Sequence, residues 1–121
     1  MHILIIEDDI FFQKFYARKL IEKGFEVDTA DDGEQGLALA KKIKPDIILL
    51  DIIMPKKDGF EVLENLSQEK DLKSVPVLVF STLSQNDDVE KAKKLGARDF
   101  VNKSLLDFNV LLEKISSLNI T

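Results

Sequence analysis

The chain has 121 residues, of which 45% are hydrophobic, and this length is enough for one compact core but hardly for two. Its net charge of -5 at pH 7 argues against general binding of nucleic acid or anionic membranes, because both attract basic surfaces. The absence of cysteine excludes a disulfide framework and thiolate metal sites. Because no segment resembles a signal peptide or a membrane span, we expect one domain, residues 1–121, in a cytoplasmic protein that does not insert into membranes.

Five short segments rich in β-branched and other aliphatic residues are predicted to form strands: 3–6, 25–29, 46–50, 77–80 and 99–101. In several of them the apolar residues are consecutive instead of alternating, which is typical of strands that are covered on both faces. This pattern predicts a parallel sheet with helices on each side.

Between these segments, apolar residues recur at intervals of three or four, which is the spacing of one helix face. The stripes are Phe12, Tyr16 and Leu20; Val89, Ala92 and Leu95; and Phe108, Leu111, Leu112 and Ile115. Gly24 and Gly96 stand just after two predicted helices, where a left-handed residue often closes the last turn. Ser84, followed three residues later by Asp87, is the predicted N-cap of the fourth helix. Strand and helix thus alternate, which predicts right-handed crossovers and a doubly wound α/β fold.

Polar side chains follow four of the predicted strands, at the edge where open α/β sheets bind their ligands. They are Glu7 and Asp8 after the first strand, Asp51 after the third, Ser81 and Thr82 after the fourth, and Lys103 after the fifth. If the first and third strands are neighbours, three carboxylates converge and repel one another. A hard cation such as Mg²⁺ or Mn²⁺ relieves this repulsion, so Glu7, Asp8 and Asp51 are predicted to bind a metal.

A carboxylate can also attack phosphorus and form an acyl phosphate, and Asp51 is the best placed of the three for this role. Phosphoryl transfer requires neutralisation of the charge on the transferring oxygens, which a metal, an ammonium and a hydroxyl provide. Lys103 and Ser81 carry the last two groups. The sequence therefore predicts Asp51 as a phosphoacceptor, with Ser81 and Lys103 as its catalytic partners.

Four segments together resemble the receiver domains of bacterial two-component response regulators. They are ILIIEDD at 3–9, DIILLDIIMPKKDG at 46–59, PVLVFS at 76–81 and GARDFVNK at 96–103. The resemblance implies a flavodoxin-like (βα)5 receiver fold with a five-stranded parallel sheet in the order 2-1-3-4-5. It also implies a phosphohistidine donor on a sensor histidine kinase or histidine phosphotransfer protein, and an unidentified downstream protein target.

The resemblance assigns roles to the acidic residues and to one backbone group. Asp51 corresponds to the phosphoacceptor, Asp8 to a direct metal ligand, and Glu7 to an acid that acts mainly through water. The backbone carbonyl of Ile53 corresponds to the remaining protein ligand of the metal.

Three further residues correspond to the family's switch. Ser81 is the hydroxyl that moves to the phosphoryl group, Lys103 is the ionic partner of that group, and Phe100 is the aromatic residue whose rotamer follows the motion. Phosphorylation is then expected to change the binding face formed by the fourth helix, fifth strand and fifth helix. The chain is therefore expected to be a signalling domain that catalyses its own phosphorylation and dephosphorylation, not a conventional enzyme.

Ser104 departs from the family, which usually has a proline in a cis peptide after the lysine. A cis bond before a residue other than proline costs about 2.5 to 4 kcal/mol, against roughly 0.5 to 1 kcal/mol before proline. We therefore expect a trans bond between Lys103 and Ser104, with Lys103 farther from Asp51 and slower phosphorylation.

Other departures concern the surroundings of the acceptor. Thr82 stands where the family prefers alanine or glycine, and its bulk is expected to narrow the path to Asp51. Ile53 and Leu83 are apolar where a polar group could orient an attacking water, so self-dephosphorylation is expected to be slow.

Two other classes of function compete with the receiver. A pseudo-receiver interaction module would use the same binding face without phosphorylation, and Ser104 and Thr82 are compatible with it, whereas the intact acidic set argues against it. A metal-dependent phosphatase of related topology commonly carries a second aspartate two residues after the first. Ile53 occupies that position here, which argues against a phosphatase.

Overall fold

The computed structural model describes residues 1–82, 86–105 and 107–118. Five parallel strands form one sheet in the order β2-β1-β3-β4-β5. The strands are β1 (His2–Ile6), β2 (Glu26–Ala30), β3 (Ile47–Leu50), β4 (Val77–Ser81) and β5 (Asp99–Asn102). Every predicted strand is present, with ends that differ by at most one residue. The predicted fold class and strand order are confirmed.

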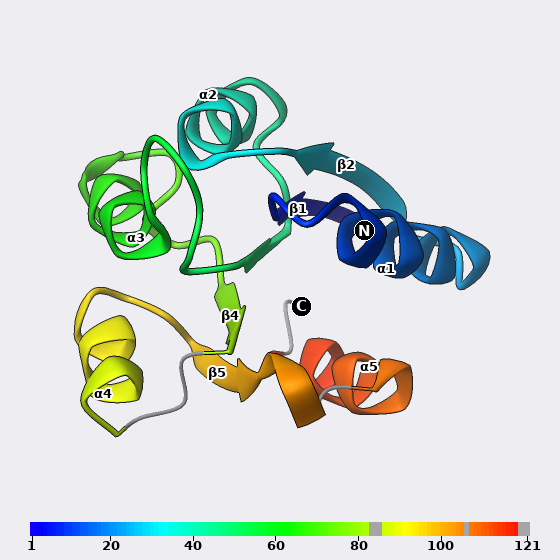
Figure 1. Cartoon of the computed structure of the whole chain (residues 1–121). Coiled ribbons are helices and arrows are strands. Elements are labelled where there is room, and N and C mark those ends of the chain that lie inside the picture. Colours follow the sequence, from blue (N-terminus) through cyan, green and yellow to red (C-terminus); the bar gives the residue numbers. More distant parts are fainter. Residues whose placement is uncertain (83–85, 106, 119–121) are drawn as a thin grey trace.

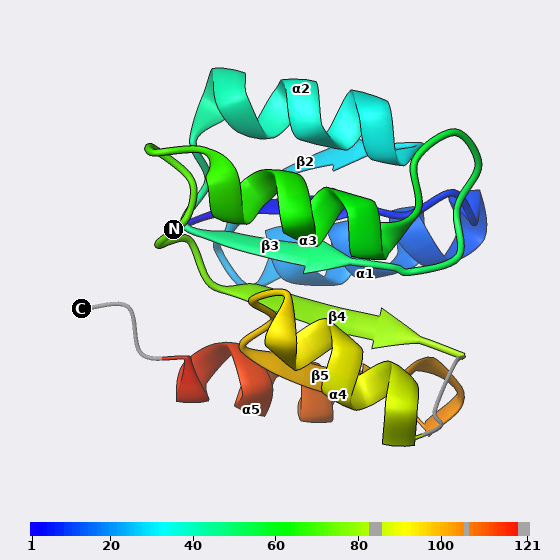
Figure 2. The same cartoon turned by 90° about the vertical axis from the view of Figure 1, so that its left-hand side faces the viewer.

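Helices cover both faces of this sheet. They are α1 (Ile10–Glu22), α2 (Gly33–Ile43), α3 (Gly59–Gln68), α4 (Asn86–Lys94) and α5 (Phe108–Ser117), with a 3₁₀ turn, η1 (Lys103–Leu105), before α5. Helices α1 and α5 lie on one face, whereas α2, α3 and α4 lie on the other (Figure 1). The second view shows these three helices side by side in front of the sheet (Figure 2). None of these helices is both long and apolar enough to cross a membrane.

The consecutive apolar residues of the central strands feed two separate cores. Ile3 and Ile5 pack with the side chains of α1 and α5, whereas Leu4 and Ile6 pack with those of α2, α3 and α4. Because successive side chains of a strand point to opposite faces, an unbroken apolar run is what a sheet between two helical layers requires. All four of these side chains have 0% exposure.

Four helices begin at an aspartate whose side chain accepts a hydrogen bond from the backbone N–H three residues later. These N-caps are Asp9 of α1, Asp32 of α2, Asp58 of α3 and Asp107 of α5. Gly24 and Gly96 have φ of 96° and 115°, which confirms their predicted left-handed conformation. The predicted N-cap Ser84 lies outside the described residues.

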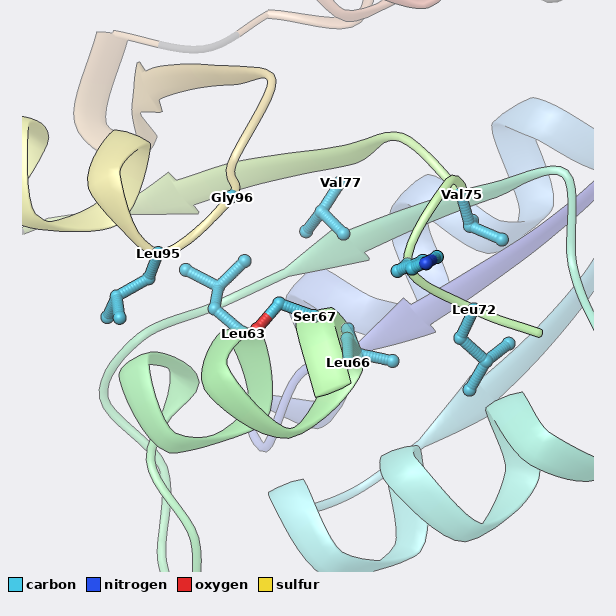
Figure 3. A pocket seen from close by; sticks show the side chains of 9 residues that line it. Leu63, Leu66, Ser67, Leu72, Val75, Val77, Leu95 and Gly96 are labelled. Carbon is cyan, nitrogen blue, oxygen red and sulfur yellow. The ribbon is translucent and has the colours of Figure 1, made fainter. Parts of the chain in front are cut away.

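A small pocket of about 30 Å³ separates α3 from the end of α4 (Figure 3). It is lined by Leu63, Leu66, Ser67, Leu72, Lys73, Val75, Val77, Leu95 and Gly96. Val77 is the first residue of β4, so the pocket lies toward the amino edge of the sheet. The polar residues predicted from the sequence lie at the opposite, carboxyl edge, and the pocket is therefore a packing gap away from them.

Candidate functional site

Three carboxylates meet at the carboxyl edge of the sheet. Glu7 follows β1 and Asp51 follows β3, and these neighbouring strands are paired so that Ile6 lies opposite Leu50. One oxygen each from Glu7, Asp8 and Asp51 lies within 4.8 Å of the other two. Glu7 and Asp51 are buried, with 0% and 4% exposure, whereas Asp8 is exposed. The predicted convergence of the three acids is confirmed.

Burial of Glu7 and Asp51 removes the water that would stabilise their negative charges. Burial is the main reason why the pKa of Glu7 is raised from its ordinary value of 4.5 to about 7, and the charge of Asp51 adds to this shift. Burial also raises the pKa of Asp51, although the neighbouring Lys103 opposes this shift. Three carboxylates with hard oxygen donors and an excess of negative charge are a donor set that suits Mg²⁺ or Mn²⁺.

Lys103 enters the same site from the turn after β5. Its Nζ contacts Oε1 of Glu7 and lies 3.7 Å from Oδ2 of Asp51. Burial lowers the pKa of Lys103, but the hydrogen bond to Glu7 and the charges of Asp51, Glu7 and Asp9 together outweigh burial and raise the pKa above its ordinary value. The lysine is therefore a charged group, and its nearest carboxylate is Glu7, not the predicted acceptor.

The peptide bond between Lys103 and Ser104 is trans, as predicted, and no cis peptide bond occurs among the described residues. Asn102 fixes the turn that follows, because its Oδ1 accepts hydrogen bonds from the backbone N–H of Ser104 at 2.9 Å and from the Ser104 hydroxyl at 2.7 Å. The trans bond does not keep the lysine out of the site, since Lys103 stays within ion-pair distance of Asp51. A slower phosphorylation stays a prediction.

The loop after β3 holds Asp51 in a defined orientation. Oδ1 of Asp51 accepts a hydrogen bond of 2.8 Å from the backbone N–H of Ile52, which leaves Oδ2 as the oxygen nearer to Lys103. Gly59, the first residue of α3, packs so closely on this segment that a Cβ atom there would lie 2.5 Å from the backbone oxygen of Asp51. The backbone oxygen of Pro55 accepts a hydrogen bond from the N–H of Lys57 at 2.8 Å, which closes a tight turn at this point.

The structure gives the position and burial of the remaining predicted residues, whose roles stay predictions. Ser81 ends β4 and is fully buried, Thr82 is exposed, and the half-buried Phe100 of β5 packs against the core beneath α2, α3 and α4. Ile53 lies two residues after Asp51 with a side chain that is 54% exposed, and the role of its carbonyl as a ligand stays a prediction.

Leu83, which was predicted to influence hydrolysis, lies outside the described residues. The described part of the loop after β4 therefore gives no test of its role.

Sequence reasoning missed one feature of the site. Phe12 was identified only as a core residue of the first helix, but the Nζ of Lys103 lies 4.4 Å from the centroid of its ring. The Phe12 ring also stacks on Phe80 of β4, with centroids 5.0 Å apart. The sequence gives no signal for this contact, because Phe12 also fits the apolar stripe that it forms with Tyr16 and Leu20.

Comparison with known proteins agrees with this geometry. A family model for the response regulator receiver domain matches residues 3–116. The chain is 34% identical over 116 residues to protein PilH of Pseudomonas aeruginosa, and the match covers 95% of each chain. It is 35% identical to the DNA-binding dual master transcriptional regulator RpaA of Synechocystis, with 96% of this chain matched but only 48% of RpaA. The structure of chemotaxis protein CheY4 of Vibrio cholerae, 28% identical in sequence, matches with a TM-score of 0.92 over 98% of both chains. The protein therefore belongs to the family of response regulator receiver domains.

Proposed function

We propose that residues 1–121 form one receiver domain that acts as a phosphorylation-dependent switch in a two-component phosphorelay. Asp51 is the acceptor of the phosphoryl group. The observation that carries this assignment is the position of Asp51, which is buried beside Glu7 and Asp8 with one oxygen bound by Ile52 and the other facing Lys103. An oriented carboxylate with adjacent cation sites is suited to attack phosphorus.

Glu7, Asp8 and Asp51 are the proposed ligands of Mg²⁺ or Mn²⁺, together with the backbone carbonyl of Ile53. Asp8 is the exposed member of the set, so it is the acid most accessible to an entering ion. When bound, the ion supplies positive charge next to the transferring phosphoryl oxygens. The chain's own contribution is to hold these carboxylates within one small region and to screen two of them from water.

The donor is a phosphohistidine on a sensor histidine kinase or a histidine phosphotransfer protein. The bond between phosphorus and the imidazole nitrogen breaks, a bond between phosphorus and an Asp51 oxygen forms, and the imidazole takes up a proton. Lys103 neutralises charge on the phosphoryl oxygens, and the Ser81 hydroxyl donates a hydrogen bond to one of them. Phe100 follows the movement of Ser81, which changes the face formed by α4, β5 and α5.

The output of the switch is binding of a protein target, not turnover of a substrate. The phosphorylated form and the free form differ in how well the α4, β5 and α5 face binds this target, and the domain forms and hydrolyses its own acyl phosphate. The proteins that this chain is similar to include a transcriptional regulator and a chemotaxis protein. Receiver domains thus serve different outputs, and the target of this chain is proposed only as a protein.

The direct test is intact-protein mass spectrometry after incubation with acetyl phosphate and Mg²⁺. We expect the wild-type protein to gain one phosphoryl group, and we expect EDTA or Asp51→Asn to prevent the gain. Asp71→Asn is a matched control, because Asp71 is a surface acid that pairs only at 3.6 Å with the exposed Lys44. A wild-type protein that gains no phosphoryl group under these conditions would support the pseudo-receiver alternative.

A further inference from the structure

The Lys103 ammonium is held by aromatic rings as well as by carboxylates. Its Nζ lies 4.4 Å from the ring centroid of Phe12 and 6.0 Å from that of Phe80. The lysine side chain is only 14% exposed, so most of its length is in contact with protein. The ammonium thus contacts an aromatic wall, formed by the rings of Phe12 and Phe80, and also lies close to the acids Glu7 and Asp51.

The aromatic wall is itself fixed from several sides. The rings of Phe12 and Phe80 stack with centroids 5.0 Å apart and an interplanar angle of 26°, and Phe80 is almost fully buried in β4. The ring centroid of Phe12 also lies 4.6 Å from that of Tyr16, one turn further along α1. Its backbone N–H donates to the N-cap Asp9 at 3.2 Å. A ring with these neighbours has little freedom to move away from the ammonium.

This arrangement matters because a lysine side chain is long and has many rotamers. The carboxylates alone do not define one position for its ammonium, since several acids lie near one another at this edge of the sheet. The face of an aromatic ring carries partial negative charge and attracts a cation, most strongly where water is excluded. The ring therefore favours the observed rotamer, in which the ammonium contacts Glu7 and lies 3.7 Å from Oδ2 of Asp51.

We propose, on the basis of the function proposed above, that Phe12 is a positioning residue for phosphoryl transfer. Its ring holds the Lys103 ammonium 3.7 Å from Oδ2 of Asp51, the proposed phosphoacceptor. Phe12 itself touches neither the phosphoryl group nor the metal. Its effect on the reaction passes through Lys103, and this dependence separates it from an ordinary core residue.

The first test compares rates of phosphorylation by saturating acetyl phosphate with Mg²⁺. Phe12→Leu and Phe12→Met keep an apolar side chain but remove the ring, and we expect each to slow the reaction about 3- to 10-fold, the range of a partly desolvated cation–π contact. Phe12→Tyr keeps the ring and is expected to stay within about twofold of wild type. Phe15→Leu is the matched control, because Phe15 lies on the same helix, is 51% exposed and faces Lys19 instead of Lys103.

The second test asks whether the effect passes through the lysine. In a Lys103→Ala background, Phe12→Leu is expected to cause no further loss of rate, because the ammonium that the ring positions is gone. An NMR measurement gives an independent signature: the methylene protons next to Nζ of Lys103 should lose their ring-current shift in Phe12→Leu and keep it in Phe12→Tyr.

Equal rates for wild type and Phe12→Leu would overturn the positioning role while leaving Asp51 as the acceptor. The same loss with and without Lys103 would also overturn it, since Phe12 would then act through packing alone. If wild-type protein gained no phosphoryl group from acetyl phosphate and Mg²⁺, the proposed function would fail, and the role of Phe12 with it.

Discussion

Two lysine–carboxylate contacts in this protein are accompanied by opposite pKa shifts of the acids. Near the surface, Nζ of Lys114 lies 2.9 Å from Oδ2 of Asp99. Burial raises the pKa of Asp99, but the hydrogen bonds from Lys114 and from the backbone N–H of Phe100, together with the charges of Lys114 and Lys93, outweigh burial and lower the pKa below its ordinary value. At the carboxyl edge of the sheet, Lys103 faces Glu7 and Asp51, yet both acids have raised pKa values, chiefly because they are buried. The contacts of Asp99 are enough to keep one partly exposed acid charged, whereas the contacts of Glu7 and Asp51 do not offset the burial of two neighbouring acids.

The difference in pKa separates an acid whose charge is balanced by its neighbours from acids whose charge is not. The Asp99 pair satisfies its own charge, so it contributes to stability without needing a ligand. The acids around Asp51 retain unneutralised negative charge in the free protein, which makes the site unfavourable for folding and favourable for a divalent cation. The two sites should therefore respond oppositely to pH, to metal and to the loss of one acid.

The largest effect should appear in the pH dependence of stability without metal. Because the folded pKa of Glu7 is about 7 and its ordinary value is 4.5, the folded protein binds more protons than the unfolded chain between these values. The stability linked to Glu7 is thus present below about pH 4.5 and is lost as pH rises through 7, by up to about 3 kcal/mol. Urea unfolding in EDTA at pH 5 and pH 8 measures it, with Glu7→Gln as the comparison.

Glu7→Gln should lose less stability than wild type over the same pH interval, because its side chain cannot ionise. If the two proteins lost equal free energy, the buried carboxyl would not be the source of the pH dependence.

A slightly smaller effect is expected from Mg²⁺. A ligand that binds only the folded state stabilises it by about 2.7 kcal/mol at a hundredfold excess over Kd. Wild-type protein and Asp99→Asn should therefore both show a rising Tm during a millimolar Mg²⁺ titration, whereas Asp8→Asn should show a much weaker rise. A Tm that does not change in wild-type protein would contradict the metal site.

Removing one of the mutually repelling acids tests whether their charges destabilise the metal-free protein. Asp51→Asn should leave the metal-free protein at least as stable as wild type at pH 8, because a buried charge disappears together with its repulsion of Glu7 and Asp8. The measurement is the urea midpoint in EDTA. A clear loss of stability would mean that Asp51 is held by favourable contacts, as Asp99 is.

The smallest effect belongs to the surface pair. Asp99→Asn should destabilise the protein by only about 0.2 to 1 kcal/mol at neutral pH, because the partly exposed pair is screened by water. Since the folded pKa of Asp99 is lowered, this stability is present above its ordinary pKa of 3.8 and is lost as pH falls below it, the opposite sign to Glu7. A destabilisation that persists unchanged at pH 3 would show that the charge is not its cause.

Much of this architecture could be predicted because it depends on local patterns. Consecutive apolar residues, as in 47–50, predicted strands buried on both faces, and the acids that follow β1 and β3 converge because these strands are neighbours. The details that depend on side-chain packing between distant segments could not be predicted. Lys103 contacts Glu7 more closely than Asp51, and Phe12 forms an aromatic wall for that lysine, because of rotamers that no spacing in the sequence encodes.

We propose that Asp51 takes up a phosphoryl group in a reaction that needs a divalent cation. Borohydride reduces an aspartyl phosphate to homoserine, so peptide mapping after treatment with acetyl phosphate, Mg²⁺ and borohydride locates the modified residue. We expect homoserine in place of Asp51, in a yield that EDTA abolishes. Homoserine at another acidic residue to the same extent, or the same yield at Asp51 in EDTA, would contradict it.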